Sequence, residues 1–112
     1  MTGIDTNILA RFFTQDDPAQ SGRVDEFLQS LTLDEPGFVS LVVLAELVWV
    51  LRGYYGATKA QIIESVKSLL TTPEIVVEAE TAVVQALARY TSNTADFADC
   101  MIERCGHIAG CS

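Results

Sequence analysis

The stretch GFVSLVVLAEL, residues 37–47, contains the change of pattern that decides the fold. Phe38 and Val39 predict a short strand, and Ser40 is a residue type that caps the N-terminus of helices. The apolar run that follows predicts a helix from Leu41 to about Arg52. A strand that passes directly into a helix is the basic unit of a parallel α/β sheet.

The same change from strand to helix occurs twice more. Residues 2–5 predict a strand before a helix at about 7–14, and residues 75–77 predict a strand before a helix at about 81–90. Helices are also predicted in three further segments, one after the cap-and-proline pair Asp17-Pro18, one after the capping box Thr58 with Gln61, and one from about Ala95 to His107. This alternation predicts an α/β fold with a parallel sheet covered by helices on both faces.

The composition limits the classes of protein to consider. A chain of 112 residues with 49% hydrophobic content predicts one compact domain. The formal net charge is -8, from 15 acidic and 7 basic residues. This charge argues against a protein that binds nucleic acid through a basic surface. A polyanionic partner would need bound divalent cations to offset the repulsion, and a basic protein would suit the same acidic surface.

We expect a cytoplasmic protein without a membrane anchor. The chain opens without a basic leader, and its longest apolar stretch, residues 38–51, contains Ser40 and Glu46 and is too short to span a bilayer. The cysteines are odd in number and lack a C-x-x-C pair, which favours buried, reduced thiols. Cys105, His107 and Cys111 would supply only three zinc ligands at an unusual spacing, so buried thiols are the preferred interpretation.

Two acidic residues follow or interrupt apolar segments. Asp5 follows a predicted strand, where α/β sheets build their sites, and it is either a helix cap or a catalytic acid. Glu46 lies in a helix that is apolar almost all round, so we expect its carboxylate to be buried and to need a partner. That partner is an ion pair with Arg11 or Arg52, a proton, or a metal ion.

Three further acids lie on one stripe of the last predicted helix. Asp96, Asp99 and Glu103 stand at positions i, i+3 and i+7 and repel one another. One interpretation makes Asp96 an N-cap, Asp99 a favourable first-turn charge and Glu103 a solvated residue. The other is that a hard divalent cation such as Mg²⁺ holds the acids together through their oxygens.

Three segments contain the candidate acids in short motifs, namely IDTNIL at residues 4–9, SLVVLAEL at residues 40–47 and ADFADCMI at residues 95–102. Together they resemble the motifs of PIN-domain ribonucleases, and most closely the VapC-type toxins of bacterial toxin-antitoxin modules. The resemblance implies a PIN-like three-layer α/β/α fold with a central parallel sheet, formed by residues 1–112 as a single PIN domain. The family usually continues into a strand with a T-x-D motif, so we expect the last strand and a fourth acid to be missing from this chain.

The resemblance also implies a site and a reaction. Asp5, Glu46 and Asp99 would bind one or two Mg²⁺ or Mn²⁺ ions, with Asp96 as a supporting acid. Thr6 or Asn7 would orient Asp5 or touch a phosphate of the substrate. The ions would activate a water molecule that attacks a phosphodiester bond of single-stranded RNA.

The implied partners are a second copy of the chain and a small VapB-like antitoxin that presents an arginine to the acids. The apolar and aromatic residues Val48, Trp49, Leu51, Tyr54 and Tyr55 are candidates for such an interface or for the core. The main alternative function is a catalytically inactive PIN-like module that binds a protein. A phosphoacceptor domain fits less well, because both lysines lie on one predicted helix rather than after a late strand.

Overall fold

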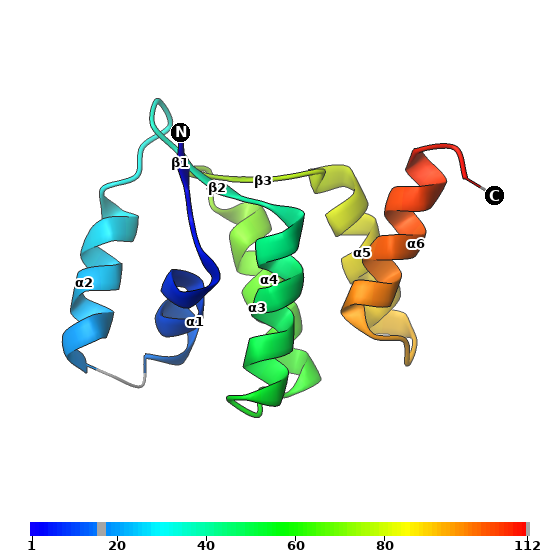
Figure 1. Ribbon diagram of the computed structural model, residues 1–112, viewed down its shortest axis with the longest axis horizontal. Coiled ribbons are helices and arrows are strands. Elements are labelled where there is room, and N and C mark those ends of the chain that lie inside the picture. The colour runs from blue at the N-terminus through cyan, green and yellow to red at the C-terminus, as the bar shows by residue number, and fades with distance from the viewer. Residues whose placement is uncertain (16–17, 112) are drawn as a thin grey trace. The chain divides into compact units, whose positions relative to one another are not determined.

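The computed structural model describes residues 1–15 and 18–111, which form two compact units, Met1–Glu78 and Ala79–Ser112 (Figure 1). The elements are β1 (Thr2–Gly3), α1 (Thr6–Thr14), α2 (Pro18–Gln29), β2 (Gly37–Val39), α3 (Leu41–Gly53), α4 (Lys59–Thr71), β3 (Ile75–Val77), α5 (Glu80–Ser92) and α6 (Phe97–Ile108). Asp17, predicted as the N-cap before Pro18, lies outside the described residues. Among the helices described, none is long and apolar enough to cross a membrane.

The three strands form one parallel sheet in the order β1-β2-β3. Gly3 pairs with Phe38, which in turn pairs with Val76 on β3. Strands that follow each other in this order, joined by crossovers of the usual right hand, place their connecting helices on one face. Figure 1 shows α1 to α4 on the same side of the strands. The predicted α/β class and its parallel sheet are confirmed. Within the first unit these helices lie on one face of the sheet (Figure 1), whereas helices on both faces were predicted.

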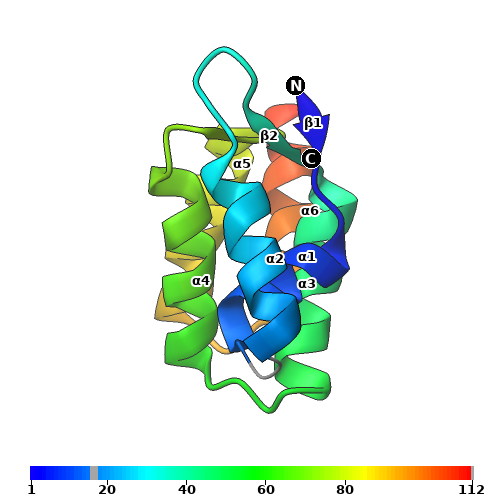
Figure 2. The ribbon, with the colours of Figure 1, turned by 90° about the vertical axis from the view of Figure 1, so that its left-hand side faces the viewer.

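The helices of the first unit pack on one another beneath the sheet. α1 contacts both α2 and α3, and α4 contacts α3 and β3 (Figure 2). Their inward-facing side chains recur at helical spacing and exclude water from a shared core. The most buried helical residues of this core are Leu9, Leu44, Leu47, Ile62 and Val66, and Val39 of β2 is buried with them.

Gly37 allows β2 to approach the residues beneath it. A Cβ atom at this position would collide with the Cδ1 atom of Ile4 and would lie 2.9 Å from the Cδ1 atom of Leu31. Any larger residue here would require the ends of both side chains to move. The start of β2 is therefore fixed by packing as well as by pairing.

The predicted caps of the two central helices are confirmed. The Ser40 hydroxyl accepts the N–H of Val43 at 3.1 Å at the start of α3. At the start of α4, Thr58 and Gln61 form a capping box, with the Thr58 N–H donating to Gln61 Oε1 at 2.8 Å. These bonds satisfy donors that the first turn of a helix leaves open.

The second unit is a hairpin in which α5 and α6 pack side by side (Figure 1). Its largest buried side chains are Tyr90 and Phe97, whose rings meet edge to face with centroids 5.6 Å apart. The remaining buried apolar residues of the hairpin are Ala82, Val83, Ala86, Cys100 and Met101. Edge-to-face aromatic pairs add to the stability gained by burial alone.

The three cysteines are free, as predicted, but they differ in exposure. Cys100 is buried, Cys105 is partly buried and Cys111 is exposed. The prediction of burial is wrong for Cys111, because this residue lies beyond the end of α6 at Ile108.

Candidate active site

The three parallel strands all end at one edge of the sheet in a polar residue. Asp5 follows β1, Ser40 follows β2 and Glu78 follows β3. Two backbone bonds extend the sheet toward these residues, from the N–H of Ile4 to the Phe38 carbonyl and from the N–H of Glu78 to the Val39 carbonyl, both 2.9 Å. The carboxyl edge of a parallel sheet is the usual position of a site in this class of fold.

Asp5 is the N-cap of α1. Its Oδ1 atom accepts the N–H of Ile8 at 2.9 Å, and the side chain is exposed. The positive end of the helix dipole favours a negative charge here. The cap interpretation is therefore confirmed, while the catalytic role of Asp5 stays a prediction that the hydrogen bond does not exclude, since a carboxylate has two oxygens.

The residues predicted to assist Asp5 differ in exposure. Thr6 is buried, with 6% of its surface exposed, while Asn7 is exposed. A buried hydroxyl can orient neighbouring groups but has little access to a substrate. The predicted contact with a phosphate is thus favoured for Asn7, and the predicted orienting role is favoured for Thr6.

The prediction that Glu46 is buried is wrong. Glu46 is exposed on α3, on a stripe with Val42 and Trp49, which are 76% and 74% exposed. The core side of the helix carries Leu44 and Leu47 instead. An apolar sequence therefore places two large hydrophobic side chains on the surface, and the Glu46 carboxylate between them is exposed to solvent.

Asp96 and Asp99 lie at the start of α6 in the second unit. Asp96 occupies the N-cap position and Asp99 the first turn, and both are exposed. The side chain of Asp96 makes no capping hydrogen bond with its helix. The backbone position predicted for Asp96 is confirmed, but its carboxylate does not hold the helix end.

Glu103, the third acid of the predicted stripe, is exposed to solvent as predicted, and it is also paired with arginine. The Arg104 guanidinium donates to both of its oxygens, with Nη2 at 2.7 Å from Oε1, and Arg89 Nη1 lies 3.8 Å from Oε1. Arg104 also donates to Gln85 at 3.2 Å. The hydrogen bond from Arg104 holds the pKa of Glu103 below its ordinary value of 4.5, and the same bond raises the pKa of Arg104.

Sequence reasoning missed Glu78. This residue follows β3 directly, and its Oε1 atom accepts the N–H of Leu41 at 2.8 Å, at the start of α3. The signal was present in the sequence, because the rule that singles out Asp5 after the first strand applies equally to an acid after the strand at residues 75–77. Its side-chain bond connects two elements that are far apart in the chain.

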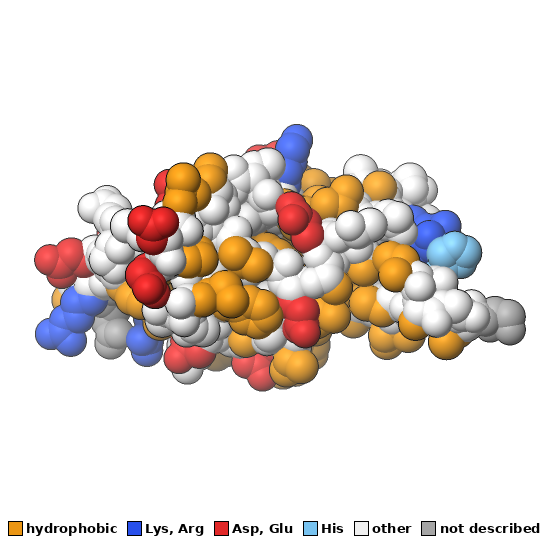
Figure 3. All heavy atoms as spheres, turned by 90° about the horizontal axis from the view of Figure 1, so that it is seen from above, with side chains coloured by type: hydrophobic (Ala, Val, Ile, Leu, Met, Phe, Trp, Pro, Cys, Tyr) orange, Lys and Arg blue, Asp and Glu red, His pale blue; other side chains and the backbone are white. Residues whose placement is uncertain are grey.

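The donor chemistry of the candidate residues fits a hard divalent cation. Carboxylate oxygens are the ligands that Mg²⁺ prefers, and Mn²⁺ takes the same ligands. Within the described residues of either unit, however, no three His, Cys, Asp or Glu side chains gather in a group that could hold a metal ion. Figure 3 shows acidic side chains on one face as separate groups among apolar surface. The predicted ligand set therefore stays a prediction.

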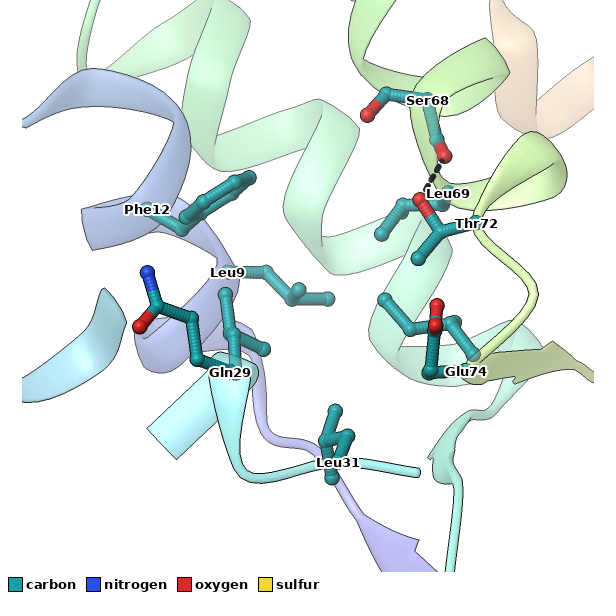
Figure 4. Close-up of a pocket in the computed structure, with 10 residues that line it drawn as sticks. Leu9, Phe12, Gln29, Leu31, Ser68, Leu69, Thr72 and Glu74 are labelled. Atoms are coloured by element: carbon teal, nitrogen blue, oxygen red, sulfur yellow. Dashed lines mark hydrogen bonds between the residues drawn. The ribbon is translucent and has the colours of Figure 1, made fainter. Parts of the chain in front are cut away.

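A cavity of about 280 Å³ lies in the first unit, away from this edge (Figure 4). It is bordered by Glu74 and Ile75, at the amino end of β3, whereas Glu78 marks the carboxyl end. Its other lining residues are Leu9, Phe12, Leu28, Gln29, Leu31, Ser68, Leu69 and Thr72. The walls are mainly apolar and hold a single carboxylate, so this cavity lacks the paired acids of a metal site.

Comparison with known protein families matches residues 4–112 to the PIN domain. Proteins of this family are generally nucleases, which are hydrolases that usually use divalent metal ions. The matched range includes every candidate acid from Asp5 to Asp99. No curated protein and no solved structure matches the chain.

Proposed function

This chain belongs to the PIN domain family, and from that premise we propose that it is an endoribonuclease that depends on Mg²⁺ or Mn²⁺. The observation that carries the proposal is the position of Asp5, an exposed carboxylate at the carboxyl edge of the parallel sheet and at the N-terminus of α1. Sites in this class of fold usually lie at that edge, and the helix dipole stabilises the negative charge of the Asp5 carboxylate.

In this proposal Asp5, Glu46 and Asp99 bind the ion and Asp96 supports them. The ion supplies an activated water molecule and stabilises negative charge at the phosphodiester. Asn7 contacts a substrate phosphate, and the buried Thr6 orients Asp5. The net charge of -8 supports the need for a cation, since a single-stranded RNA substrate would otherwise be repelled.

We also propose that the protein is a cytoplasmic VapC-type toxin that forms a homodimer and is inhibited by a VapB-like antitoxin. The exposed face of α3 supports a protein partner, because Val42 and Trp49 flank Glu46 there and large exposed apolar side chains are characteristic of contact surfaces. A partner that presents an arginine between apolar side chains would complement this face. Tyr54, the residue after α3, is 80% exposed, whereas Val48 and Leu51 are buried in the core.

A catalytically inactive protein-binding module is the second candidate. Two observations favour it: Asp5 already serves as a helix cap, and the described part of each unit lacks a group of three potential ligands. This candidate shares the exposed face of α3 with the toxin proposal but requires no metal ion. The two candidates therefore differ in metal binding.

Cleavage of a labelled single-stranded RNA by the full chain tests the proposal. We expect cleavage with Mn²⁺ or Mg²⁺, none with a chelator, and loss of cleavage in Asp99→Asn. Asp34→Asn, the same change in an exposed turn, is the matched control and should cleave normally.

Millimolar Mn²⁺ should also raise the melting temperature of the protein, because it relieves repulsion between the acids. Cleavage by Asp99→Asn at the full rate would refute the proposed ligand set, and a protein that neither cleaves RNA nor responds to Mn²⁺ would favour the binding module.

A further inference from the structure

Glu78 is bonded to the chain on both sides of Ser40. Its backbone N–H donates to the Val39 carbonyl at 2.9 Å, and its side-chain Oε1 accepts the N–H of Leu41 at 2.8 Å. The residue thus fastens the end of β3 both to the end of β2 and to the start of α3. The side-chain bond joins residues that are 37 positions apart in the sequence.

The first turn of α3 depends on two side chains. The Ser40 hydroxyl accepts a hydrogen bond from the N–H of Val43 at 3.1 Å, and the Glu78 carboxylate accepts one from the N–H of Leu41. Both donors are among the first N–H groups of the helix, which have no carbonyl partner within the helix. A carboxylate is the stronger acceptor of the two, because its charge strengthens the hydrogen bond and interacts favourably with the helix dipole.

The position of Glu46 depends on how α3 begins. Glu46 lies five residues after Leu41, about 8 Å along the helix at roughly 1.5 Å per residue. Its side chain is exposed, so the packing of the helix, and not contacts of the side chain itself, fixes where the carboxylate stands. A displacement of the first turn would move Glu46 relative to the carboxyl edge of the sheet.

We infer that Glu78 is a positioning residue, which holds the first turn of α3 through the Leu41 N–H and thereby sets the place of the Glu46 carboxylate at the candidate metal site. The inference rests on the proposed function for the role of Glu46. Glu78 acts through its acceptor oxygen and not through its charge alone. A glutamine at this position keeps such an oxygen, whereas an alanine does not.

Two variants and two measurements test this role in the full chain. We expect Glu78→Ala to weaken Mn²⁺ binding, measured by calorimetry, about tenfold, which is typical when a group that orients a metal ligand is removed. Glu78→Gln should restore affinity to within about threefold of the wild type. Glu74→Ala and Glu74→Gln, at the other end of β3, are the matched controls and should bind Mn²⁺ as the wild type does.

Hydrogen exchange without metal gives the second measurement. The amide of Leu41 should exchange about tenfold faster in Glu78→Ala and near the wild-type rate in Glu78→Gln.

An equal and large loss of Mn²⁺ affinity in both Glu78 variants would make Glu78 a direct ligand and overturn the inference. Unchanged exchange at Leu41 in Glu78→Ala would also overturn it. A wild-type protein that binds no Mn²⁺ would refute the proposed function, and with it the role assigned to Glu78 at a metal site, whereas the exchange rates would still report whether Glu78 holds α3.

Discussion

Asp5 and Asp96 both stand directly before a helix in extended backbone, with ψ of 166° and 152°, yet they serve their helices differently. Asp5 accepts the N–H of Ile8 at 2.9 Å, whereas Asp96 makes no capping hydrogen bond. The start of α6 is held instead by Phe97, which is 1% exposed and packs against Tyr90. A hydrogen bond thus fixes the first turn of α1 and apolar packing fixes that of α6, so the Asp96 carboxylate is not needed to hold its helix.

The largest effect should come from removing the packing that holds α6. Phe97→Ala should lower the free energy of unfolding by about 3–5 kcal/mol, because it removes a fully buried aromatic side chain and leaves a cavity. Denaturant unfolding followed by circular dichroism measures this loss. Ile102→Ala is the control on the same helix, since Ile102 is 71% exposed and its loss should cost little. A loss below about 1 kcal/mol for Phe97→Ala would contradict the view that packing holds this helix start.

The second prediction separates capping from chemistry at Asp5. Asn caps helices as well as Asp does, so Asp5→Asn should keep the stability of α1 while lowering metal-dependent RNA cleavage by more than about 100-fold. Asp96→Asn should lower cleavage by about tenfold, as expected for a supporting acid. Rates of cleavage under single-turnover conditions, with melting temperatures as a control for folding, measure both. Equal effects of the two changes would remove the distinction between ligand and supporting acid.

Most of the fold could be predicted because it depends on local signals. The strand at residues 75–77 and the capping box at Thr58 are encoded by a few neighbouring residues, and both occur as predicted. The predicted helix at about 81–90 is found as α5 at Glu80–Ser92. Caps, turns and the period of apolar residues act over one or two helical turns, which a sequence shows directly.

The candidate site was harder to predict because burial and long-range bonds set its electrostatics. The apolar neighbours of Glu46 indicated a buried acid, but a helix at the surface exposes one stripe whatever its composition, and Glu46 lies on that stripe with Trp49. The bond from Glu78 to Leu41 joins two elements whose proximity is set by the order of the sheet. The pairing of Glu103 with Arg104 depends on side-chain orientations on α6 that residue spacing does not specify.

A smaller effect should distinguish the two N-cap positions by stability alone. Asp5→Ala should lower the free energy of unfolding by about 1 kcal/mol, because the N–H of Ile8 loses its acceptor. Asp96→Ala should cost only a few tenths of a kcal/mol, since it removes a favourable charge near the helix dipole but no hydrogen bond. Denaturant midpoints of the two variants, compared with the wild type, measure the difference. A loss at Asp96 as large as that at Asp5 would mean that Asp96 caps α6 in solution.

The smallest effect concerns the third acid of the α6 stripe, which differs from Asp96 by its arginine partner. The hydrogen bond from Arg104 lowers the pKa of Glu103 in the folded state below 4.5, so the folded protein is stabilised above that pH. This contribution is lost as the pH falls through the lowered pKa, because Glu103 then becomes protonated. The wild type should therefore unfold at a slightly higher denaturant concentration than Glu103→Gln at neutral pH, and the difference should disappear on acidification below 4.5.

Glu80→Gln, the same change of charge on α5, controls for the altered net charge. The small size of the expected difference follows from the exposure of Glu103, whose side chain is 50% accessible and whose pairing is screened by solvent. A difference between wild type and Glu103→Gln that stays constant across the acid range would mean that the ion pair does not form in solution. Without that pair, Glu103 would repel the other two acids of the stripe. The cation proposed to bind near Asp96 and Asp99 would then have Glu103 as a further candidate ligand.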